Sequence, residues 1–469
     1  MTTMLLRNTI QPNPATSNVL IQLLILASLL FLPAATIQAA PNQRLITPDH
    51  SLQQAIDNAN EADTLLLAPG IYQGNFVINK PLTLQCQQGA ELNGNAVHDT
   101  VKITAPNVTI KGCSILNWGD DLTTMDAGIV VKKTADNVLI KNNYFKGPVF
   151  GVFLDAAPNS KIHNNRIEGI IDIRSQDRGN GIHMYATQGA DIAFNEVWHT
   201  RDGVYIDTSN KNTIRSNEFH HLRYGVHYMY SHHNRVLDNY THHTRSGYAL
   251  MQSKYLTVIG NRSEFDQNYG ILMNFITHST VENNHISRVQ QGTNPAGGQA
   301  IRGAEGKGLF LYNSLFNRLV GNTVQHTDLG IHLTAGSEDN VIAGNNFIAN
   351  RQQVKYVATR QQEWSNKEAG NFWSDYLGWD RDNNGIGDIV YEPNDSIDRL
   401  LWKYPSAKVL MHSPAIEALR WVQRKFPVLK SPGVTDSFPL MRPSAQPTHH
   451  PTATLTTRVT PPMNEEKTL

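Results

Sequence analysis

Histidine, arginine and methionine side chains recur in this sequence at intervals of 22 residues, and these columns are the strongest candidates for chemistry. The columns are His199, His221 and His243; His220 and His242; Arg201, Arg223 and Arg245; His183, Tyr205 and His227; and Met229 and Met251. Neutral imidazole and thioether groups are suitable copper ligands, and thioether particularly favours the cuprous ion. We therefore predict a surface that handles copper, with candidate ligands His183, His199, His221, His227, His243, Met229 and Met251.

The arginine column indicates a different kind of contact. Like charges repeated at one spacing repel each other, so Arg201, Arg223 and Arg245 predict an anionic partner. Glu196 and Glu218 are also 22 residues apart. They offer the alternative that the arginines are neutralised within the protein.

Two other interpretations of the columns remain open. Duplicated coils inherit identical residues, so the histidines can form a purely structural ladder, or the surface can be a groove for a polysaccharide or another small ligand. A carbohydrate lyase or hydrolase needs an acid pair, or an acid with a basic partner. The outward column of Asp155 and Asp207 changes to methionine on the next coils, and Tyr185 follows Asp155. We therefore predict no catalytic residues and no enzymatic activity.

The elements that must position these side chains are short strands in a repeating coil. Apolar strands open at Gly128, Gly151, Gly181, Gly203, Gly225, Gly247, Gly270, Gly308 and Gly330, and an asparagine column runs through Asn143, Asn165, Asn195, Asn217, Asn239, Asn261, Asn283, Asn322 and Asn345. Most separations in both columns are 22 or 23 residues, and the same two insertions lengthen one interval to 30 and another to 38 or 39 in both columns. Alternate strand residues point inward, and one coil buries its apolar face only by stacking on its neighbours. The sequence predicts an all-β fold, a right-handed parallel β-helix, with left-handed asparagines at its corners and paired asparagine side chains.

Two insertions interrupt the period at the same corner, between the asparagine column and the next glycine. They cover residues 170–180 and 290–307, on either side of four shorter coils. Insertions in solenoids tend to gather on one face, which is often the binding face. We expect two loop walls with a groove between them, at the corner that carries the histidines and arginines.

The N-terminal region has the pattern of an export signal over residues 1–39, with Arg7 as its single charge and an apolar segment over 19–32. An uncleaved anchor is the alternative. Ser51 then precedes apolar residues at helical spacing, which predicts a helix that caps the stack. Residues 63–72 resemble the first strand. Lys+Arg and Asp+Glu are both 40, which argues against a nucleic-acid partner.

Cys86 and Cys113 are 27 residues apart, which is close to one coil. In an oxidising compartment they can bridge neighbouring coils. Two buried free thiols that behave as small apolar residues are the alternative.

The repeat ends at about residue 350, and the composition then changes. Asp380, Asp382, Asn384 and Asp388 place oxygen ligands around a glycine, as in a calcium loop. Tyr391 stands where an EF-hand has its glutamate, so a turn stabilised by these residues is favoured over calcium.

A basic, partly amphipathic helix is predicted from Ser413 to about Phe426. It would either dock on a partner at a membrane surface or pack over the end of the β-helix. The residues from Pro443 onward are rich in proline and threonine and are predicted to be disordered.

Several C-terminal motifs follow the coils in order. They are Gly370-Asn-Phe-Trp-Ser-Asp-Tyr, Asp-Asn-Asn-Gly-Ile-Gly-Asp388, Tyr404-Pro, Ser413-Pro-Ala, Phe426-Pro and Asp436-Ser-Phe-Pro-Leu. With the leader and the coils, this order resembles the NosD family of nitrous-oxide reductase maturation proteins over nearly all of the mature chain. Many β-helix families share such coils, whereas the C-terminal motifs are much more specific.

The resemblance implies a periplasmic protein, exported by a signal peptide and associated with an inner-membrane complex. It implies work with the ATPase and membrane subunits of an ABC transporter in assembling the copper–sulfur centre of nitrous-oxide reductase. The reductase and a copper chaperone are then expected partners, with copper as transient cargo and no firmly bound cofactor. The expected organisation is a signal peptide (1–39), the β-helix (40–360), a C-terminal capping and docking segment (361–442) and the tail (443–469).

Overall fold

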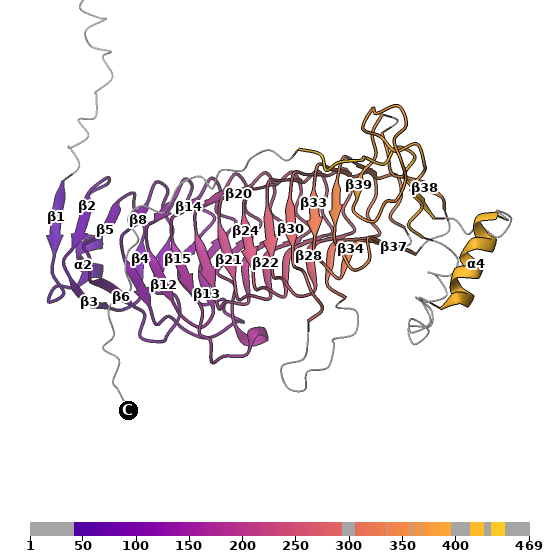
Figure 1. Cartoon of the computed structure of the whole chain (residues 1–469). Coiled ribbons are helices and arrows are strands. Elements are labelled where there is room, and N and C mark those ends of the chain that lie inside the picture. The colour runs from indigo at the N-terminus through magenta and orange to yellow at the C-terminus, as the bar shows by residue number, and fades with distance from the viewer. Residues whose placement is uncertain are drawn as a thin grey trace, which may run out of the picture. The chain divides into compact units, whose positions relative to one another are not determined.

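A computed structural model of the protein describes residues 42–292, 305–334, 336–357, 360–366, 368–394, 413–425 and 433–445. Successive strands visit three parallel sheets, A, B and C, in turn, and each sheet runs along the stack of coils (Figure 1). The predicted parallel β-helix is therefore confirmed.

The strands are short, as the period requires. Sheet A contains β1 (Gln43–Ile46), β2 (Thr64–Leu67), β5 (Thr83–Cys86), β8 (Thr109–Lys111), β11 (Leu139–Lys141), β14 (Lys161–His163), β17 (Asp191–Ala193), β20 (Thr213–Arg215), β23 (Arg235–Leu237), β26 (Thr257–Ile259), β29 (Thr280–Glu282), β32 (Arg318–Val320) and β35 (Val341–Ala343). Sheet B contains β3 (Gly70–Gln73), β6 (Ala90–Asn93), β9 (Ser114–Leu116), β12 (Tyr144–Lys146), β15 (Arg166–Glu168), β18 (Glu196–Trp198), β21 (Glu218–His220), β24 (Tyr240–His242), β27 (Arg262–Glu264), β30 (His285–Ser287), β33 (Thr323–Gln325), β36 (Asn346–Ile348) and β39 (Phe372–Trp373). Sheet C contains β4 (Phe76–Ile78), β7 (Val101–Ile103), β10 (Ala127–Val131), β13 (Phe150–Asp155), β16 (Ile182–Tyr185), β19 (Asp202–Asp207), β22 (Tyr224–Met229), β25 (Ser246–Met251), β28 (Tyr269–Asn274), β31 (Lys307–Tyr312), β34 (Leu329–Thr334) and β37 (Val354–Val357). A small sheet pairs β38 (Gln362–Glu363) with β40 (Val434–Thr435), and the helical elements are α2 (Leu52–Asp57), the 3₁₀ turn η1 (Ser175–Asp177) and α4 (Pro414–Lys425).

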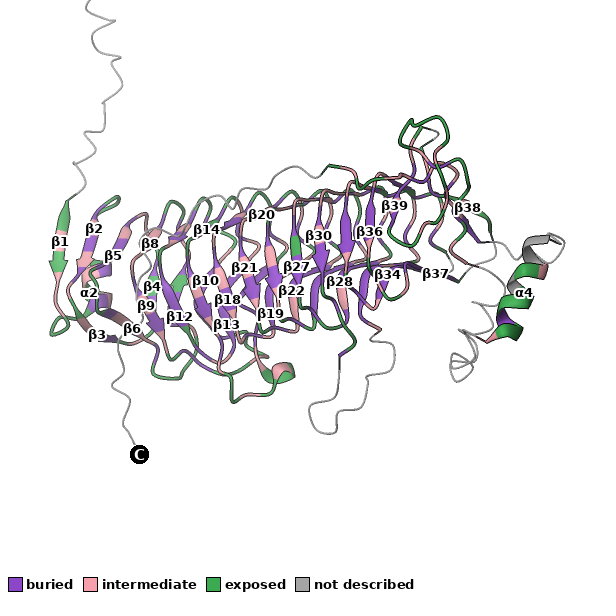
Figure 2. Ribbon diagram, viewed as in Figure 1, coloured by how far each residue is buried: buried purple, intermediate pink, exposed green. Residues whose placement is uncertain are grey.

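The core lies inside the coils, where alternate residues of each strand meet their counterparts one coil away. Val204 pairs in register with Val226, and Ile206 with Tyr228. All four are fully buried, and buried residues follow the strands along the stack (Figure 2). Complete burial of such a side chain stabilises a fold by about 1.5–3 kcal/mol, so stacking itself supplies the stability of the coils.

The glycine that opens most sheet C strands is required because adjacent coils approach closely there. A β-carbon on Gly203 would lie 2.5 Å from the carbonyl oxygen of Gly225, and one on Gly225 would lie 2.8 Å from that of Gly247. Any side chain would force the coils apart, so this column marks a close backbone approach.

The asparagine column forms a ladder at the turn between sheets A and B. The Oδ1 atom of Asn217 accepts the backbone N–H of Asn195 at 2.9 Å, and that of Asn239 accepts the N–H of Asn217 at 3.1 Å. The Nδ2 group of Asn195 donates to the carbonyl oxygen of Ile162 at 2.7 Å. The ladder therefore satisfies buried backbone groups that would otherwise lack partners.

Two details of the predicted column were wrong. The ladder passes through Asn284 rather than Asn283, because Asn284 Oδ1 accepts the N–H of Asn261 at 2.9 Å. From Asn143 to Asn345 the left-handed residue is the one before the rung, such as Ser216 (φ 52°) and Asn283 (φ 53°). The backbone turns first, the rung follows, and the next strand begins one residue after the rung.

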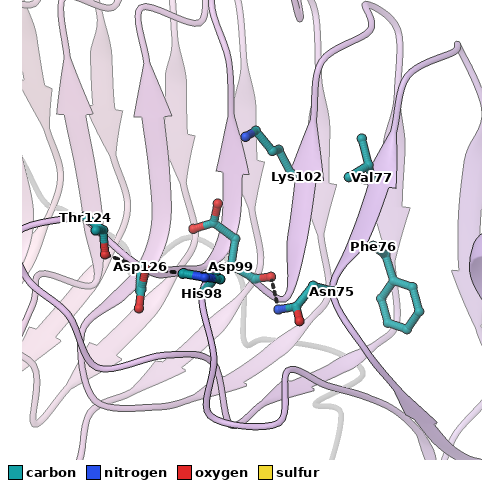
Figure 3. A pocket seen from close by; sticks show the side chains of 8 residues that line it. All are labelled: Asn75, Phe76, Val77, His98, Asp99, Lys102, Thr124 and Asp126. Atoms are coloured by element: carbon teal, nitrogen blue, oxygen red, sulfur yellow. Dashed lines mark hydrogen bonds and ion pairs between the residues drawn. The ribbon is translucent and has the colours of Figure 1, made fainter.

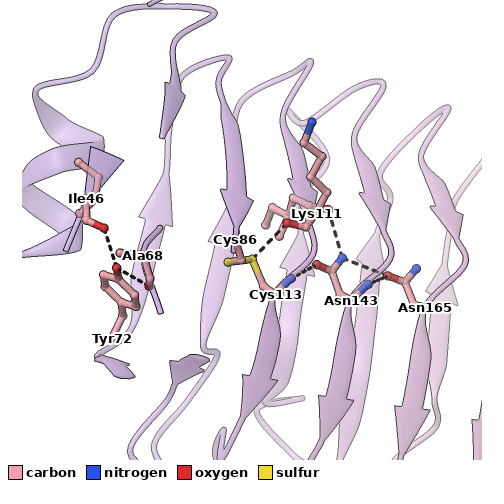
Figure 4. Close-up of a disulfide and its surroundings, with 9 residues drawn as sticks. Ile46, Ala68, Tyr72, Cys86, Lys111, Cys113, Asn143 and Asn165 are labelled. Carbon is pink, nitrogen blue, oxygen red and sulfur yellow. Dashed lines mark hydrogen bonds between the residues drawn. A yellow bond between two sulfur atoms is a disulfide. The ribbon is translucent and has the colours of Figure 1, made fainter. Parts of the chain in front are cut away.

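Cys86 and Cys113 form a disulfide between neighbouring coils (Figure 4). The backbone N–H of Cys113 donates to Asn143 Oδ1 at 3.0 Å, so the asparagine ladder begins at the second cysteine. Of the two alternatives left by the sequence, the structure contains the disulfide, which suits an oxidising compartment.

The predicted cap helix is confirmed as α2. Ser51 caps it by accepting the N–H of Gln54 at 3.3 Å. The side chain of Gln53 accepts the N–H of Val77 at 2.8 Å and donates to its carbonyl oxygen at 3.1 Å. Val77 belongs to β4, the edge strand of sheet C, so the helix satisfies an edge that would otherwise be open to aggregation. The prediction that the first strand lies in residues 63–72 was wrong, because the exposed β1 precedes α2 and pairs with β2.

A distant segment closes the other end of the ladder. Asn371 is the last rung, and its N–H donates to Asp436 Oδ2 at 2.7 Å. Trp373 Nε1 donates to the same oxygen at 2.8 Å, and Asp436 is fully buried. The Asn-Phe-Trp and Asp-Ser-Phe-Pro motifs therefore meet, and sheet B continues past the expected boundary at residue 360.

The predicted C-terminal helix is present as α4, and the carbonyl oxygen of Ser413 accepts the N–H of Glu417 at 3.1 Å. Its Leu419 and Trp421 side chains are 52% and 55% exposed. Within the described part of the chain, no helix is both long and apolar enough to cross a membrane. The predicted signal peptide and nearly all of the tail lie outside the described residues.

Candidate functional site: the histidine corner

The turn from sheet B to sheet C carries five histidines on three successive coils. His220 and His242 end β21 and β24, and His199, His221 and His243 follow β18, β21 and β24 with φ of 56°, 56° and 53°. Histidine is one of the residue types enriched in left-handed conformations. These five residues are called the histidine corner below.

The rings of the corner stack along the coil axis. The His220 and His242 centroids are 4.9 Å apart with planes at 11°, and those of His221 and His243 are 5.5 Å apart at 5°. Trp198 stacks on His220 at 5.7 Å, and Phe265 stacks on His243 at 5.2 Å. Aromatic residues therefore limit the run of paired histidines at both ends.

Neighbouring histidines within one coil also point at each other. The Nδ1 atoms of His220 and His221 are 2.8 Å apart, and those of His242 and His243 are 2.9 Å apart. Such a contact joins one donor nitrogen to one acceptor nitrogen. The sequence placed His220 and His242 in a second column but did not predict them as ligands, because it does not show which ring nitrogens meet.

A glutamate one coil back faces the second nitrogen of each strand histidine. His220 Nε2 is 3.7 Å from Glu196 Oε1, and His242 Nε2 is 3.3 Å from Glu218 Oε1. Contact with His220, and then with Arg166, lowers the pKa of Glu196 to about 2. The corner therefore presents imidazoles with a carboxylate behind them, an arrangement that orients metal-binding histidines.

Burial, followed by the charges of neighbouring histidines, lowers the pKa values of His221 and His243. These rings are therefore neutral at neutral pH, as metal binding requires. Among the described residues, no three or more His, Cys, Asp or Glu side chains are arranged to hold one metal ion. The corner presents its imidazole nitrogens in pairs, which suits a metal ion with a low coordination number.

The strand column of His183, Tyr205 and His227 lies in the predicted register but packs as an aromatic column. The His183 and Tyr205 rings are 5.0 Å apart, and those of Tyr205 and His227 are 4.7 Å apart. His183 and His227 are only 6% and 8% exposed, and burial lowers the pKa of His183 to about 4. His227 Nδ1 lies 2.8 Å from the buried Asp202 carboxylate. Both imidazoles therefore have local packing roles.

Met229 and Met251 are half-buried at the far ends of β22 and β25. Five strand steps separate Tyr224 from Met229, which is roughly 16 Å. The structure therefore does not bring the methionines together with the histidine corner. They lie at the turn from sheet C to sheet A, next to Tyr230, which is 52% exposed.

The arginine column is neutralised at one position. Arg223 donates to both oxygens of Asp202 at 2.8 and 2.6 Å. The alternative that Glu196 or Glu218 neutralises the column was wrong, since these carboxylates face Arg166, His220 and His242. No ion pair of Arg201 or Arg245 occurs among the described residues, and Arg201 Nε is buried without a hydrogen-bond partner.

Both insertions occur at the turn from sheet B to sheet C, as predicted. The first is fastened to the histidine corner by Arg178, which donates to the carbonyl oxygens of His199 at 2.8 Å and Ile171 at 2.7 Å. Residues 293–304 of the second lie outside the described residues. The groove between two walls therefore stays a prediction.

A cavity of about 280 Å³ near the N-terminal coils contains two carboxylates, Asp99 and Asp126, that the sequence columns did not predict (Figure 3). Asp99 accepts the N–H of Ala127 at 3.1 Å, and burial raises its pKa. Asp126 accepts the hydroxyl of Thr124 at 2.8 Å. These aspartates lie in irregular coils, so no column contains them, and each carboxylate already has a local hydrogen bond.

The predicted calcium-like loop is held by its own backbone. Asp380 accepts the N–H groups of Asn384 at 3.1 Å and Gly385 at 2.8 Å, and Asp388 accepts that of Arg381 at 2.7 Å. Asp382 accepts the Asn384 side-chain amide at 2.9 Å. In this state the carboxylates stabilise a turn, and calcium binding stays a prediction.

An exposed apolar surface adjoins this loop. Leu377 is 93% exposed and Trp379 is 56% exposed, with Ile389 and Val390 at 42% and 44%. Large apolar side chains grouped on a surface commonly mark an interaction site. We call these four residues the C-terminal apolar surface.

Comparisons with known proteins agree with this architecture. A family profile described as "Periplasmic copper-binding protein (NosD)" matches residues 168–378. The chain is 60% identical over 382 residues to a Pseudomonas aeruginosa protein named "Probable ABC transporter binding protein NosD", covering 81% of this chain and 89% of that protein. It is 54% identical over 415 residues to a protein of the same name from Stutzerimonas stutzeri, covering 88% and 93%.

Among solved structures, a family 28 exopolygalacturonase from Yersinia enterocolitica matches with a TM-score of 0.52, covering 68% of this chain and 78% of that chain. At 11% identity this likeness shows the fold alone. The two sequence relatives are named as binding proteins rather than enzymes. Since both are more than half identical to this chain over most of its length, the chain belongs to the NosD family.

Proposed function

We propose that the protein is a periplasmic accessory factor that handles copper as cargo for the copper–sulfur centre of nitrous-oxide reductase. It works with the ATPase and membrane subunits of an ABC transporter. The observation that carries the proposal is the histidine corner, where stacked imidazoles lie on adjacent coils beside carboxylates. The disulfide suits export, the family is described as copper-binding, and the Pseudomonas aeruginosa relative is named as an ABC transporter binding protein.

The other predicted site residues have different roles. His183 and His227 pack the strand column, because they are buried and His227 already faces Asp202. Met229 and Met251 form a separate soft-donor position at the opposite turn. Arg201 and Arg245, near the corner, contact the acidic surface of a copper chaperone or of the apo-reductase.

Copper(I) titration of the mature protein against a competing chelator tests the cargo. The matched variants replace the five corner histidines with glutamine, or replace His233 and His278, which also adopt left-handed conformations and contact Tyr255 at another turn. We expect stoichiometric binding in the wild type and in the His233/His278 control, and its loss in the corner variant. Equal binding in all three proteins would remove the corner from the proposal.

The C-terminal apolar surface is the proposed contact with the membrane subunit. Leu377→Ser with Trp379→Ser should keep the fold, because both side chains are largely exposed. We expect this variant to lose co-purification with the transporter subunits and to lower the copper content of the reductase in cells. Met229→Leu with Met251→Leu tests the methionine position. We expect this variant to bind the transporter subunits normally but to lower the copper content of the reductase.

A further inference from the structure

We infer that the histidine corner contains two separate two-coordinate sites for a cuprous ion, each formed by the Nδ1 atoms of consecutive histidines. One site pairs His220 with His221, and the other pairs His242 with His243. This inference rests on the proposed function and specifies its atoms, number of ions and positioning groups.

The distances fit one N–H···N contact between the Nδ1 atoms, and when an ion binds there this proton moves to Nε2 of the turn histidine, so that both Nδ1 lone pairs face the ion. The Nδ1 atoms are 2.8 Å apart in the first pair and 2.9 Å apart in the second. Two metal–nitrogen bonds of about 2.0–2.1 Å place the nitrogens about 3.3 Å apart at a tetrahedral angle and about 4 Å apart when collinear. Each pair must therefore open by roughly 1 Å. His221 and His243 are the exposed members of the pairs and make this movement by shifting along their stack, whereas the strand histidines are half-buried.

The glutamates fix which nitrogen is available. A proton on His242 Nε2 faces Glu218 Oε1 at 3.3 Å, which leaves the Nδ1 lone pair directed at His243. Glu196 takes the corresponding place behind His220 at 3.7 Å. Glu196 and Glu218 are positioning residues, and the charge of Glu196 is already paired with Arg166 at 2.9 Å.

The number of sites follows from where the pairs stop. One coil earlier His199 is preceded by Trp198, and one coil later Phe265 is preceded by Glu264, so neither position has two adjacent imidazoles. Within the described ranges no third His, Cys, Asp or Glu completes a metal site. Closed tetrahedral zinc needs four ligands, whereas two imidazole nitrogens with no third ligand favour a soft monovalent ion over zinc.

Single and paired substitutions in the full mature protein count the sites. With Met229→Leu and Met251→Leu removing the separate soft-donor position throughout, we expect two equivalents of copper(I) when the corner is intact, one after His220→Gln or His242→Gln, and none in the double variant. His199→Gln is the matched control, because it removes a corner imidazole without a pair, and it should still bind two equivalents. Glu218→Gln should keep two equivalents but weaken one site by roughly tenfold or more.

Nitrogen-15 spectra of the histidine rings give an independent reading. On adding copper(I), the Nδ1 resonances of the four paired rings should shift, and Glu218→Gln should change the tautomer of His242 before any metal is added. A merely structural glutamate would leave that tautomer unchanged.

Each other outcome overturns the inference in a distinguishable way. Stoichiometric copper binding that persists in the His220/His242 double variant rejects these sites and leaves the proposed function standing. One equivalent shared by both pairs, or coordination through Nε2, rejects the two-site geometry. No copper binding by the wild type rejects both the inference and the copper-handling part of the proposed function.

Discussion

Replacing Asp436 should loosen the C-terminal end of the asparagine ladder. Its carboxylate accepts the N–H of Asn371 at 2.7 Å, Trp373 Nε1 at 2.8 Å and the N–H of Phe438 at 3.2 Å. Asp436→Ala leaves the two buried donors of Asn371 and Trp373 without an acceptor. Each such orphaned group costs about 1–3 kcal/mol, so we expect a local loss of about 4 kcal/mol. Asp436→Asn keeps one acceptor oxygen and should cost about 1–2 kcal/mol.

The loss should be graded along the stack, because each coil of a solenoid contacts only its neighbours. Hydrogen exchange of the rung amides measures this directly. Protection should fall most at Asn371, less at Asn345 and not at Asn217.

Burial raises the pKa of Asp436, so the carboxyl group of Asp436 holds its proton more tightly in the folded protein than in the unfolded chain. The wild type should therefore lose a little stability as pH rises through the range just above 3.8, and Asp436→Asn should not. Unchanged protection in Asp436→Ala, or a uniform loss over all coils, would refute the role of Asp436 as the ladder's end.

Three further predictions concern other contacts. Removing the disulfide with Cys86→Ala and Cys113→Ala should lower the free energy of unfolding by about 3.5 kcal/mol on the loop-entropy estimate for a separation of 27 residues; denaturation of the wild type with reductant provides the comparison, and equal midpoints would contradict the estimate. Burial raises the pKa of Asp202, but contact with Arg223 and His227 lowers it further, so the pKa lies below its ordinary value. The stabilising effect of the Asp202 carboxylate should therefore be complete above pH 3.8 and be lost as pH falls through the lower folded-state pKa. Asp202→Asn should cost about 3–5 kcal/mol at neutral pH and flatten that acid dependence, and an unaltered acid-denaturation profile would exclude this ion pair as its cause. Gln53→Ala should free the β4 edge at a cost of about 1 kcal/mol and promote self-association, visible by sedimentation, whereas a strictly monomeric variant would show that the helix backbone alone protects the edge.

The prediction of the fold depended on period, and period is a property of the chain itself. Glycine and asparagine recur because every coil repeats the same close approach and the same turn. An error of one residue at Asn283 was possible because adjacent asparagines satisfy the same spacing, and only the hydrogen bond from Asn261 to Asn284 distinguishes them. The first strand was missed because β1 pairs at one edge and carries no repeat signal.

The candidate site was predicted only as a set of columns. Sequence spacing placed His199, His221 and His243 at one turn, and the structure agrees. It could not separate the exposed corner from the buried His227, because outward alternation says nothing about what covers the outward face. Sequence spacing also grouped Met229 with the histidines in one predicted copper surface, although the six-residue strand β22 separates Met229 from the histidine corner.

The sequence by itself determined the coil, the position of the insertions, the cap helix and the identity of the family, because these depend on local repetition and on motifs within the chain. Tertiary structure alone decided which histidine ring nitrogens face each other, which arginine pairs with Asp202, and that Asp436 closes the ladder at Asn371. The physical reason is that these contacts join residues on different coils, or neighbours whose ring orientation depends on the coils above and below them. Stacking fixes those orientations, and no interval in the sequence records them.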